Sequence, residues 1–331
     1  MKISNISPVK VNNLNILNSQ RKKLNTYIHT RNCDSVSFTS NLVSAQKLQE
    51  IKAKSKEIKE NAVDILSESF DVKDKSYELL ETAKEEYMLA CQYIEIVKRN
   101  IQFGECELDS GNTLRFNFVL ENGDDFYLHI VEYDLDEQPI REIAAENFRP
   151  TGVSIVDGED IQDMFDYNTN RVLISHNVNR DDDGVMFADM MSVFDSGRLL
   201  SVKTDSTITT EPLAYDKYYY FIDDQLITYS KDNITHEFGD SEQTERYNFL
   251  DGKILSYCVE FHSFDNDSCA WDEGYYYKNG KLIGHSNANA QKSFDTPVEC
   301  EKAIFLNREN KFVEEHNVKF VLDDDGGAIF G

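Results

Sequence analysis

The sequence predicts an α+β fold, in which a long N-terminal helix or helical hairpin precedes a large antiparallel β-meander built of hairpin repeats of about 28 residues. Residues 43–100 have the apolar spacing of an amphipathic helical segment. Turn residues recur between residues 165 and 315, and an aromatic residue returns there at intervals of 27, 27, 28, 28 and 28 positions. We call these aromatic residues the aromatic ladder: Tyr167, Phe194, Phe221, Phe249, Tyr277 and Phe305.

A two-residue turn follows each of the first five ladder residues. Asp-Gly and Asn-Gly favour the positive φ values of a type I′ turn, and the predicted tips are Thr169-Asn170, Ser196-Gly197, Asp223-Asp224, Asp251-Gly252 and Asn279-Gly280. Such a turn fixes the strand register, so each unit should place an aromatic residue opposite an aliphatic one. The predicted pairs are Tyr167 with Val172, Phe194 with Leu199, Phe221 with Leu226, Phe249 with Ile254, and Tyr277 with Leu282.

Between these tips lies a second row of turns, at Gly184, Glu211, Gly239, Asp267 and Asp295. One repeat therefore consists of two strands and two turns. Acidic residues gather around the second row, and we call them the acidic edge: Asp181, Asp182, Asp183, Glu211, Asp240, Glu242, Asp265, Asp267 and Asp295. This edge is a candidate docking site for a protein partner. The competing interpretation is that its charge keeps a large exposed sheet soluble.

The net charge of -26 is concentrated in the strand region. Residues 1–33 contain 6 Lys and Arg and no acid, residues 43–100 contain 10 basic and 12 acidic residues, and residues 101–331 contain 18 and 47. Nucleic acids are bound by Lys and Arg side chains that displace counterions from the phosphates. The excess of 29 acids in residues 101–331 (47 minus 18) therefore argues against a nucleic-acid partner.

The basic, Asn-rich composition of residues 1–42 predicts a disordered tail. This segment lacks the apolar core of a secretory signal, and no stretch of the chain has the length and apolarity that predict a membrane span. A plain tail is one interpretation. The other is an organellar transit peptide or an export tag that is not cleaved, because both tend to be basic and poor in acid.

Two apolar runs within residues 43–100 follow helical spacing: Leu48, Ile51, Ser55, Ile58, Ala62 and Ile65, then Leu80, Ala83, Tyr87, Ala90, Ile94 and Val97. The phase slips by one residue near residues 70–74, which contain neither Gly nor Pro. One long helix and a helical hairpin are therefore both allowed. We expect the apolar face to cover the chain's own sheet. The alternative is an oligomer formed through a coiled coil of residues 43–100.

Residues 101–331 form the predicted β-hairpin domain, and its first part lies outside the regular spacing. Residues 116–120 and 126–131 flank Asn122-Gly123 and predict a hairpin. Further turns are predicted at residues 133–140 and at Asp157-Gly158. We interpret these segments as earlier, diverged hairpins of the same sheet.

The best-preserved unit is Tyr275-Tyr276-Tyr277-Lys278-Asn279-Gly280-Lys281-Leu282-Ile283-Gly284. It resembles the MORN-type variant repeat of bacterial hairpin-repeat proteins, some of which are YwqK-like antitoxins. Residues 249–254 are similar, and residues 194–202 also resemble a tyrosine-aspartate (YD) repeat. The resemblance covers about residues 165–315 and implies a scaffold or a binding surface. It transfers no catalytic residue.

No motif in the chain predicts catalysis, a cofactor or a metal site. The seven His show no HExxH spacing, and the glycine patterns of nucleotide-binding loops are absent. The six Cys form no CxxC pair, and a turn at Asn266-Asp267 places Cys258 opposite Tyr275 and Cys269 opposite Phe264. Free thiols are typical of a reducing compartment, so we expect a cytoplasmic protein.

These features lead to two functional hypotheses. The first is a non-enzymatic interaction or scaffold protein, whose extended sheet or acidic edge binds a protein that the sequence does not identify. The second is an exported or host-directed effector. Its N-terminal tail would target it, and its repeats would bind a target protein.

Overall fold

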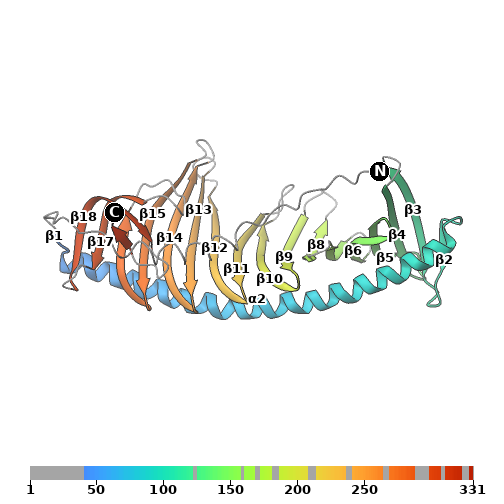
Figure 1. The fold of residues 1–331 in the computed structure, drawn as a ribbon, viewed down its shortest axis with the longest axis horizontal. Coiled ribbons are helices and arrows are strands. Elements are labelled where there is room, and N and C mark those ends of the chain that lie inside the picture. The colour runs from blue at the N-terminus through green and yellow to red at the C-terminus, as the bar shows by residue number, and fades with distance from the viewer. Residues whose placement is uncertain are drawn as a thin grey trace, which may run out of the picture. The chain divides into compact units, whose positions relative to one another are not determined.

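The computed structural model shown in Figure 1 describes residues 41–121, 125–157, 160–167, 172–180, 186–207, 214–235, 241–263, 268–287, 298–306, 310–322 and 328–330. These residues form one long helix and one antiparallel sheet. The predicted tail of residues 1–42 lies outside the described residues, except for Asn41 and Leu42. The predicted tips at Thr169-Asn170, Asn122-Gly123 and Gly158 also lie outside them.

Helix α2 (Ala45–Asn100) is continuous over 56 residues, so the helical-hairpin alternative is wrong. The hydroxyl of Ser44 caps its N-terminus by accepting a hydrogen bond from the Lys47 N–H. Lys98 and Arg99 lie in the last turn, where positive charges interact favourably with the helix dipole. Ser69 and Ser76 fill the apparent gap between the two apolar runs, because both are buried on the same face. The buried face is thus uninterrupted.

The strands follow one another along the chain as a meander. Their bounds are β1 (Asn41–Leu42), β2 (Glu105–Glu107), β3 (Thr113–Glu121), β4 (Asp125–Tyr133), β5 (Pro139–Glu146), β6 (Arg149–Asp157), β7 (Asp160–Tyr167), β8 (Val172–Arg180), β9 (Met186–Asp195), β10 (Arg198–Thr207), β11 (Ala214–Ile222), β12 (Gln225–Thr235), β13 (Ser241–Leu250), β14 (Lys253–Ser263), β15 (Ser268–Lys278), β16 (Lys281–Asn287), β17 (Val298–Leu306), β18 (Phe312–Leu322) and β19 (Ala328–Phe330).

Consecutive strands pair antiparallel from β2 to β19, and β1 pairs with β18. The chain therefore closes one end of the sheet with its first strand. The predicted hairpin of residues 116–131 is confirmed, with Phe116 opposite Ile130 and Leu120 opposite Phe126.

The five predicted cross-strand pairs of aromatic and aliphatic residues are all present, from Tyr167 opposite Val172 to Tyr277 opposite Leu282. The tips at residues 196–197, 223–224, 251–252 and 279–280 have positive φ at both positions, as a type I′ turn requires. Phe305 lies opposite Val313 in the backbone register, but its side chain is not among those described.

The register differs from the prediction near the second row of turns. Cys258 lies opposite Gly274 and Cys269 opposite His262, whereas Tyr275 and Phe264 were expected. Two features cause the difference: β14 ends at Ser263 and β15 begins at Ser268, which is a longer connection than two residues, and the pairing shifts between Val259 and Glu260. Bulges of this kind reset every pair beyond them.

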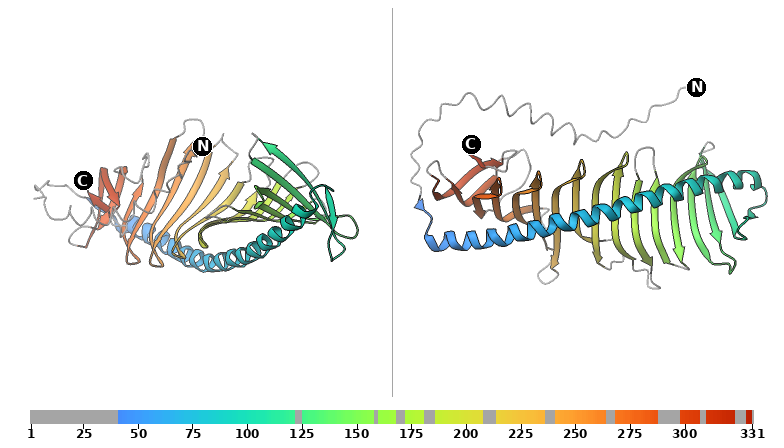
Figure 2. Two further views of the ribbon diagram at one scale, coloured as in Figure 1. Left: turned by 45° about the vertical axis from the view of Figure 1, so that its right-hand side comes forward. Right: turned by 90° about the horizontal axis from the view of Figure 1, so that it is seen from below.

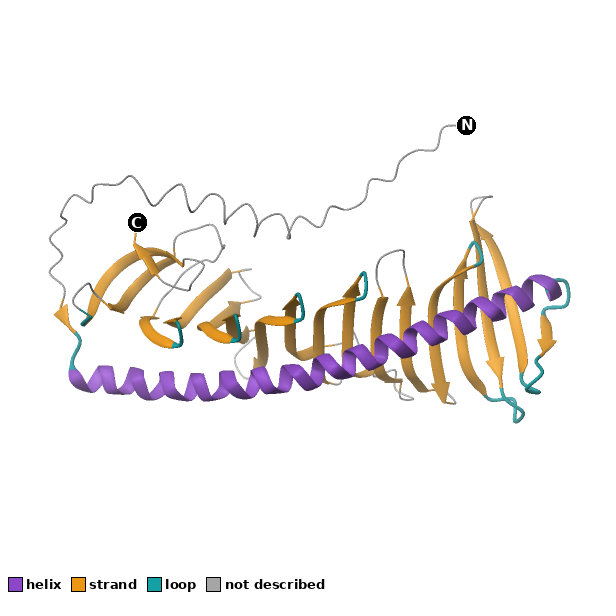
Figure 3. Cartoon of the chain, turned by 60° about the horizontal axis from the view of Figure 1, so that its bottom comes forward, coloured by secondary structure: helices purple, strands orange, loops and turns teal. Residues whose placement is uncertain are grey.

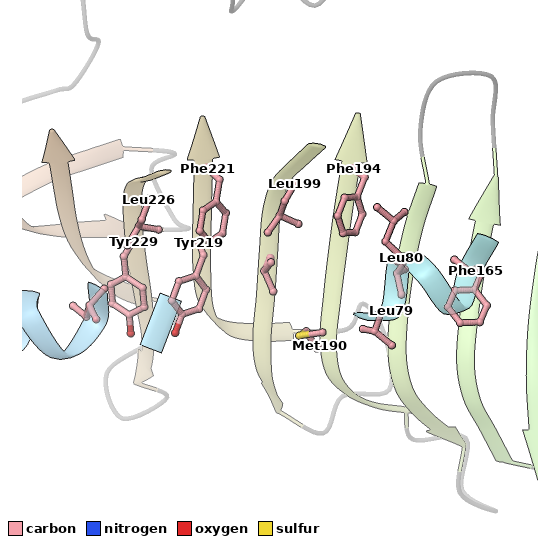
Figure 4. Close-up of a cluster of buried hydrophobic side chains, with 14 of the residues drawn as sticks. Leu79, Leu80, Phe165, Met190, Phe194, Leu199, Tyr219, Phe221, Leu226 and Tyr229 are labelled. Carbon is pink, nitrogen blue, oxygen red and sulfur yellow. The ribbon is translucent and has the colours of Figure 1, made fainter. Parts of the chain in front are cut away.

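Helix α2 crosses one face of the sheet along its length (Figures 2 and 3). Its closest backbone approaches include β6, β8, β10, β12, β14 and β16, which is one strand of each successive hairpin. Large side chains of the sheet form one buried cluster with Leu79 and Leu80 of the helix, and Figure 4 shows Phe194 and Phe165 on either side of these two leucines. The expectation that the helix covers the chain's own sheet is therefore confirmed. Its apolar face is not available for a coiled coil.

Small residues recur every seven positions on the buried face of α2. They are Ser55, Ala62, Ser69, Ser76, Ala83 and Ala90, and Val97 continues the series. The hydroxyls of Ser69 and Ser76 donate to the carbonyl oxygens of Leu66 and Val72 within the helix, at 2.8 Å each. A small side chain whose polar group is already bonded lets the helix approach the large aromatic residues of the sheet.

Candidate interaction surface

Ladder residues contact α2 on the face of the sheet that the helix covers. The Tyr167 hydroxyl donates a hydrogen bond to the Ala83 carbonyl oxygen at 2.6 Å. Tyr277 is fully buried beside Ser55, and burial raises the pKa of its phenol to about 12 against a smaller opposing effect of the Ser55 hydroxyl. Phe194, Phe221 and Phe249 are also buried. The five ladder residues whose side chains the structure describes therefore belong to the core between helix and sheet.

A second row of aromatic residues runs parallel to the ladder on this face, and we call it the tyrosine row. Its ring centroids lie 5.1, 6.0, 4.8 and 6.1 Å apart along Tyr219, Tyr229, Tyr247, Tyr257 and Tyr275. Edge-on and tilted contacts at these distances stabilise a sheet beyond simple burial. Asn61 of α2 donates to the Tyr247 hydroxyl at 3.5 Å, and burial raises the pKa of this tyrosine to about 12.

The tyrosine row ends in a charged cluster. His285 lies 4.7 Å from Tyr275 between ring centroids, and its Nε2 atom is 2.8 Å from Oε1 of Glu273. The Tyr275 hydroxyl donates to the same carboxylate oxygen at 2.8 Å. The His285 hydrogen bond, offset by burial and assisted by that of Tyr275, lowers the pKa of Glu273. The carboxylate is thus held in its charged form.

A second charged cluster joins the C-terminal half of α2 to the first strands. Arg141 binds Glu86 through two nitrogens, at 2.7 and 3.2 Å, and also contacts Glu132. Asn112 donates to the other oxygen of Glu132 at 2.7 Å. Burial, followed by the charge and hydrogen bond of Glu132, raises the pKa of Tyr93 to about 12. The polar groups of this cluster bond one another, as buried charges must.

The opposite face of the sheet is what we call the open face, defined over β11–β13 by Tyr218, Tyr220, Ile222, Arg246 and Leu250. Tyr220 and Ile222 alternate with the buried Tyr219 and Phe221, so they point away from α2. Their exposed fractions are 55% and 39%, and that of Leu250 is 37%. Tyrosine, arginine and exposed aliphatic residues are the composition of protein-binding surfaces.

Polar residues cross the open face in register. The Thr228 hydroxyl donates to Asn248 at 3.1 Å, and the Asn248 amide donates to Ser256 at 2.9 Å. The same face is buried in the next strands, β14–β16, where Cys258, Tyr276 and Ser286 are almost completely inaccessible to solvent. Among β11–β16, exposed side chains on this face are therefore concentrated over β11–β13.

The acidic edge lies outside the described residues, with one exception. Glu242 belongs to β13, where its backbone pairs with Ile234 and His262, and its side chain is not described.

The sequence reasoning missed the tyrosine row, although its signal is present. Tyr219, Tyr247 and Tyr275 are 28 positions apart, and each precedes a ladder residue by two. Tyr229, Tyr257 and His285 are also 28 positions apart. Only one aromatic residue was counted in each unit, so this second periodicity was overlooked.

Over the described ranges, no group of three or more His, Cys, Asp or Glu residues could hold a metal ion. Within those same ranges, α2 lacks the apolar stretch that a membrane-crossing helix needs.

Comparison with protein-family models finds no match, and comparison with curated proteins finds no match either.

Proposed function

We propose that this chain is a non-enzymatic scaffold protein. Hairpin repeats of about 28 residues build its sheet, each repeat rests on seven residues of α2, and the open face binds a protein partner. The proposal has an architectural part and a functional part, and each has its own support.

The spacing of contacts between helix and sheet supports the architectural part. Ser55 lies beside Tyr277, and Ala83 accepts a hydrogen bond from Tyr167. Between these two contacts α2 advances 28 residues (83 minus 55), while the sheet advances 110 residues (277 minus 167). Four steps of seven helical residues thus correspond to four repeats of 27 or 28 residues.

The two lengths agree in ångströms as well. The 28 helical residues span roughly 42 Å at 1.5 Å per residue. The eight strand spacings from β7 to β15 span roughly 38 Å at about 4.8 Å each. Contacts between these two ends keep the same order, since Asn61 bonds Tyr247, Glu68 pairs with Lys217, and Ser76 bonds Ser192.

The open face carries the functional part of the proposal. Helix α2 leaves this face uncovered over β11–β13, where Tyr220, Ile222 and Leu250 are exposed beside Arg246. A rigid sheet that presents aromatic and aliphatic side chains at low entropic cost suits protein recognition. The MORN-type resemblance of residues 249–254 and 275–284 is consistent with a scaffold role.

Affinity purification with the full-length chain tests the functional part. Tyr220→Glu combined with Ile222→Glu should remove the proteins that co-purify with the wild type, because two charges then occupy the centre of the open face. Val63→Asp is the matched control, since Val63 is 65% exposed on α2, away from the open face. Unchanged partners with the double variant, at an unchanged circular dichroism spectrum, would contradict the proposal.

The effector hypothesis is the second candidate, and the composition of the N-terminal tail supports it. Residues 1–33 combine 6 basic residues with no acid, whereas the rest of the chain is strongly acidic. Deletion of residues 1–40 should then change the distribution of the protein among cell fractions and leave the thermal stability of the remaining chain unchanged. An unaltered distribution would remove this candidate.

A further inference from the structure

The β3–β4 hairpin has an uncovered edge. Strand β2 pairs with β3 only from Thr113 to Arg115, and the Phe116 N–H then donates to the Gly104 carbonyl oxygen at 3.0 Å. Beyond Phe116, the described part of the chain places β4 on one side of β3 and no strand on the other. With respect to the described residues, the backbone of residues 117–121 is therefore a free strand edge.

Exposed apolar side chains occupy this edge. Phe118, Val119 and Leu120 are 47%, 57% and 65% exposed, and Tyr127 on β4 is 40% exposed. Phe118 stacks on Phe126 with 5.3 Å between ring centroids, which fixes its ring at the rim of the hairpin. A free strand edge with exposed apolar residues is a surface on which another strand adds.

The direction of the backbone groups follows from the bond to Gly104. The Phe116 N–H points away from β4, so the N–H and C=O groups of Phe118 and Leu120 point away from it as well. The groups of Asn117 and Val119 point toward β4. Phe118 and Leu120 are thus the residues that can bond a strand added at the edge.

We infer that a second copy of this chain is the occupant, paired antiparallel about a two-fold axis at Val119. Phe118 of each copy then lies opposite Leu120 of the other, which gives two hydrogen-bonded pairs and an apolar contact on one face. The two Val119 residues lie opposite each other as the non-hydrogen-bonded pair. The pairing extends the sheet of one copy into the sheet of the other, at a surface separate from the open face.

Charge favours this arrangement over a parallel one. Residues 116–120 carry no charge, Arg115 precedes them and Glu121 follows them. Antiparallel pairing places the position of Glu121 opposite Asn117 of the second copy and diagonal to Arg115. A parallel pair would align Glu121 with Glu121. Arg115 is 43% exposed and its contacts with Glu137 and Glu105 are long, at 3.4 and 3.8 Å.

Disulfide crosslinking of the full-length Val119→Cys variant tests the inference. In a non-hydrogen-bonded pair the two Cα atoms lie about 4.5 Å apart, which is within disulfide range. Mild oxidation should give a dimer whose crosslinked peptide contains Cys at position 119 from both copies. Tyr127→Cys is the matched control, because Tyr127 lies opposite Val119 but one strand farther from the edge. It should not crosslink to itself.

Light scattering of the wild-type chain completes the test. We expect a dimer at micromolar concentration that salt strengthens, since each copy carries a net charge of -26. Leu120→Arg should abolish the dimer and leave the circular dichroism spectrum unchanged. A monomer at all salt concentrations would overturn the inference, as would a dimer that survives Leu120→Arg or equal crosslinking by Tyr127→Cys.

Discussion

The hydroxyl of Tyr167 donates a 2.6 Å hydrogen bond to the backbone carbonyl oxygen of Ala83, a residue of α2 whose side chain is fully buried. The bond ties the aromatic ladder of the sheet to one of the small residues that recur every seven positions along the helix. Burial, together with the negative charge of Glu86, raises the pKa of the phenol and keeps it protonated as a donor.

Removal of this hydroxyl should destabilise the fold. Tyr167→Phe loses one hydrogen bond at nearly constant volume, so the free energy of unfolding should fall by about 0.5–1.5 kcal/mol. Tyr220→Phe is the control, because Tyr220 is 55% exposed on the other face and should leave stability unchanged. Denaturant unfolding of both variants measures the difference, and equal effects would show that the contact with Ala83 adds nothing.

A large residue in the row of small ones should separate helix and sheet. Ala83→Leu forces extra volume into a site with no accessible surface, which costs about 1–3 kcal/mol. Met88→Leu serves as the control, since Met88 is 64% exposed on the same helix. Thermal unfolding followed by circular dichroism should show a lower midpoint for Ala83→Leu alone.

Glycines at the hairpin tips should contribute to the stability of the fold through their backbone conformation. Gly252 has a φ of +70° and no atom near the place of a Cβ, so Gly252→Ala costs only the left-handed conformation, about 1–2 kcal/mol. Gly152 has ordinary φ, and its Cβ would make ordinary contacts at 3.5–3.8 Å. Gly152→Ala should therefore be neutral or slightly stabilising. Chemical unfolding distinguishes the two variants, and a loss of stability in Gly152→Ala would count against this reasoning.

The cluster at the end of the tyrosine row should make stability depend on pH. The pKa of Glu273 is lowered by its hydrogen bonds to His285 and Tyr275, so the folded state binds its proton less readily than the unfolded state. Its stabilising contribution is present above the ordinary glutamate pKa of 4.5 and is lost as the pH falls through the lower folded value.

Comparison of the wild type with Glu273→Gln isolates this contribution. At neutral pH the variant should be less stable by about 0.5–1.5 kcal/mol, the usual contribution of such hydrogen bonds. The difference should shrink as the pH is lowered below 4.5. A difference that stays constant across this range would show that the charge of Glu273 has no part in it.

The strand pairs could be predicted because their causes are local. A two-residue turn at Asp251-Gly252 sets the pairing of Phe249 with Ile254 without help from the rest of the chain, and the structure confirms that pair. The register around Cys258 could not be predicted, because a bulge between Val259 and Glu260 shifts it. No residue type at that position signals the bulge.

The helix was harder to predict for a different reason. The apolar spacing slips by one residue near residues 70–74, which allowed a helical hairpin as the alternative, and neither apolar run included Ser69 or Ser76. In the structure both hydroxyls bond carbonyl oxygens of their own helix, and the residues pack as small buried side chains. The proposed interaction surface has no local sequence signature, because Tyr220 and Tyr219 differ only in which face of β11 they occupy.

Deletion of a matched pair of segments tests the proposed repeat architecture most directly. Removal of residues 222–249 takes out 28 residues of sheet and brings the tip Asp251-Gly252 next to Phe221. Removal of residues 63–69 takes out seven helical residues directly after the part of the helix where Asn61 contacts Tyr247, among them Glu68, the partner of Lys217, so that Ala62 precedes Phe70. Each single deletion shifts the helix relative to every hairpin on one side of the cut.

The measurement is the thermal unfolding midpoint of the wild type, the two single deletions and the double deletion, followed by circular dichroism. The matched repeat predicts that the double deletion unfolds cooperatively and at a higher temperature than either single deletion, because the second cut restores the register that the first one destroyed. A double deletion that is less stable than both single deletions would contradict the one-to-one match of helical heptads and hairpins.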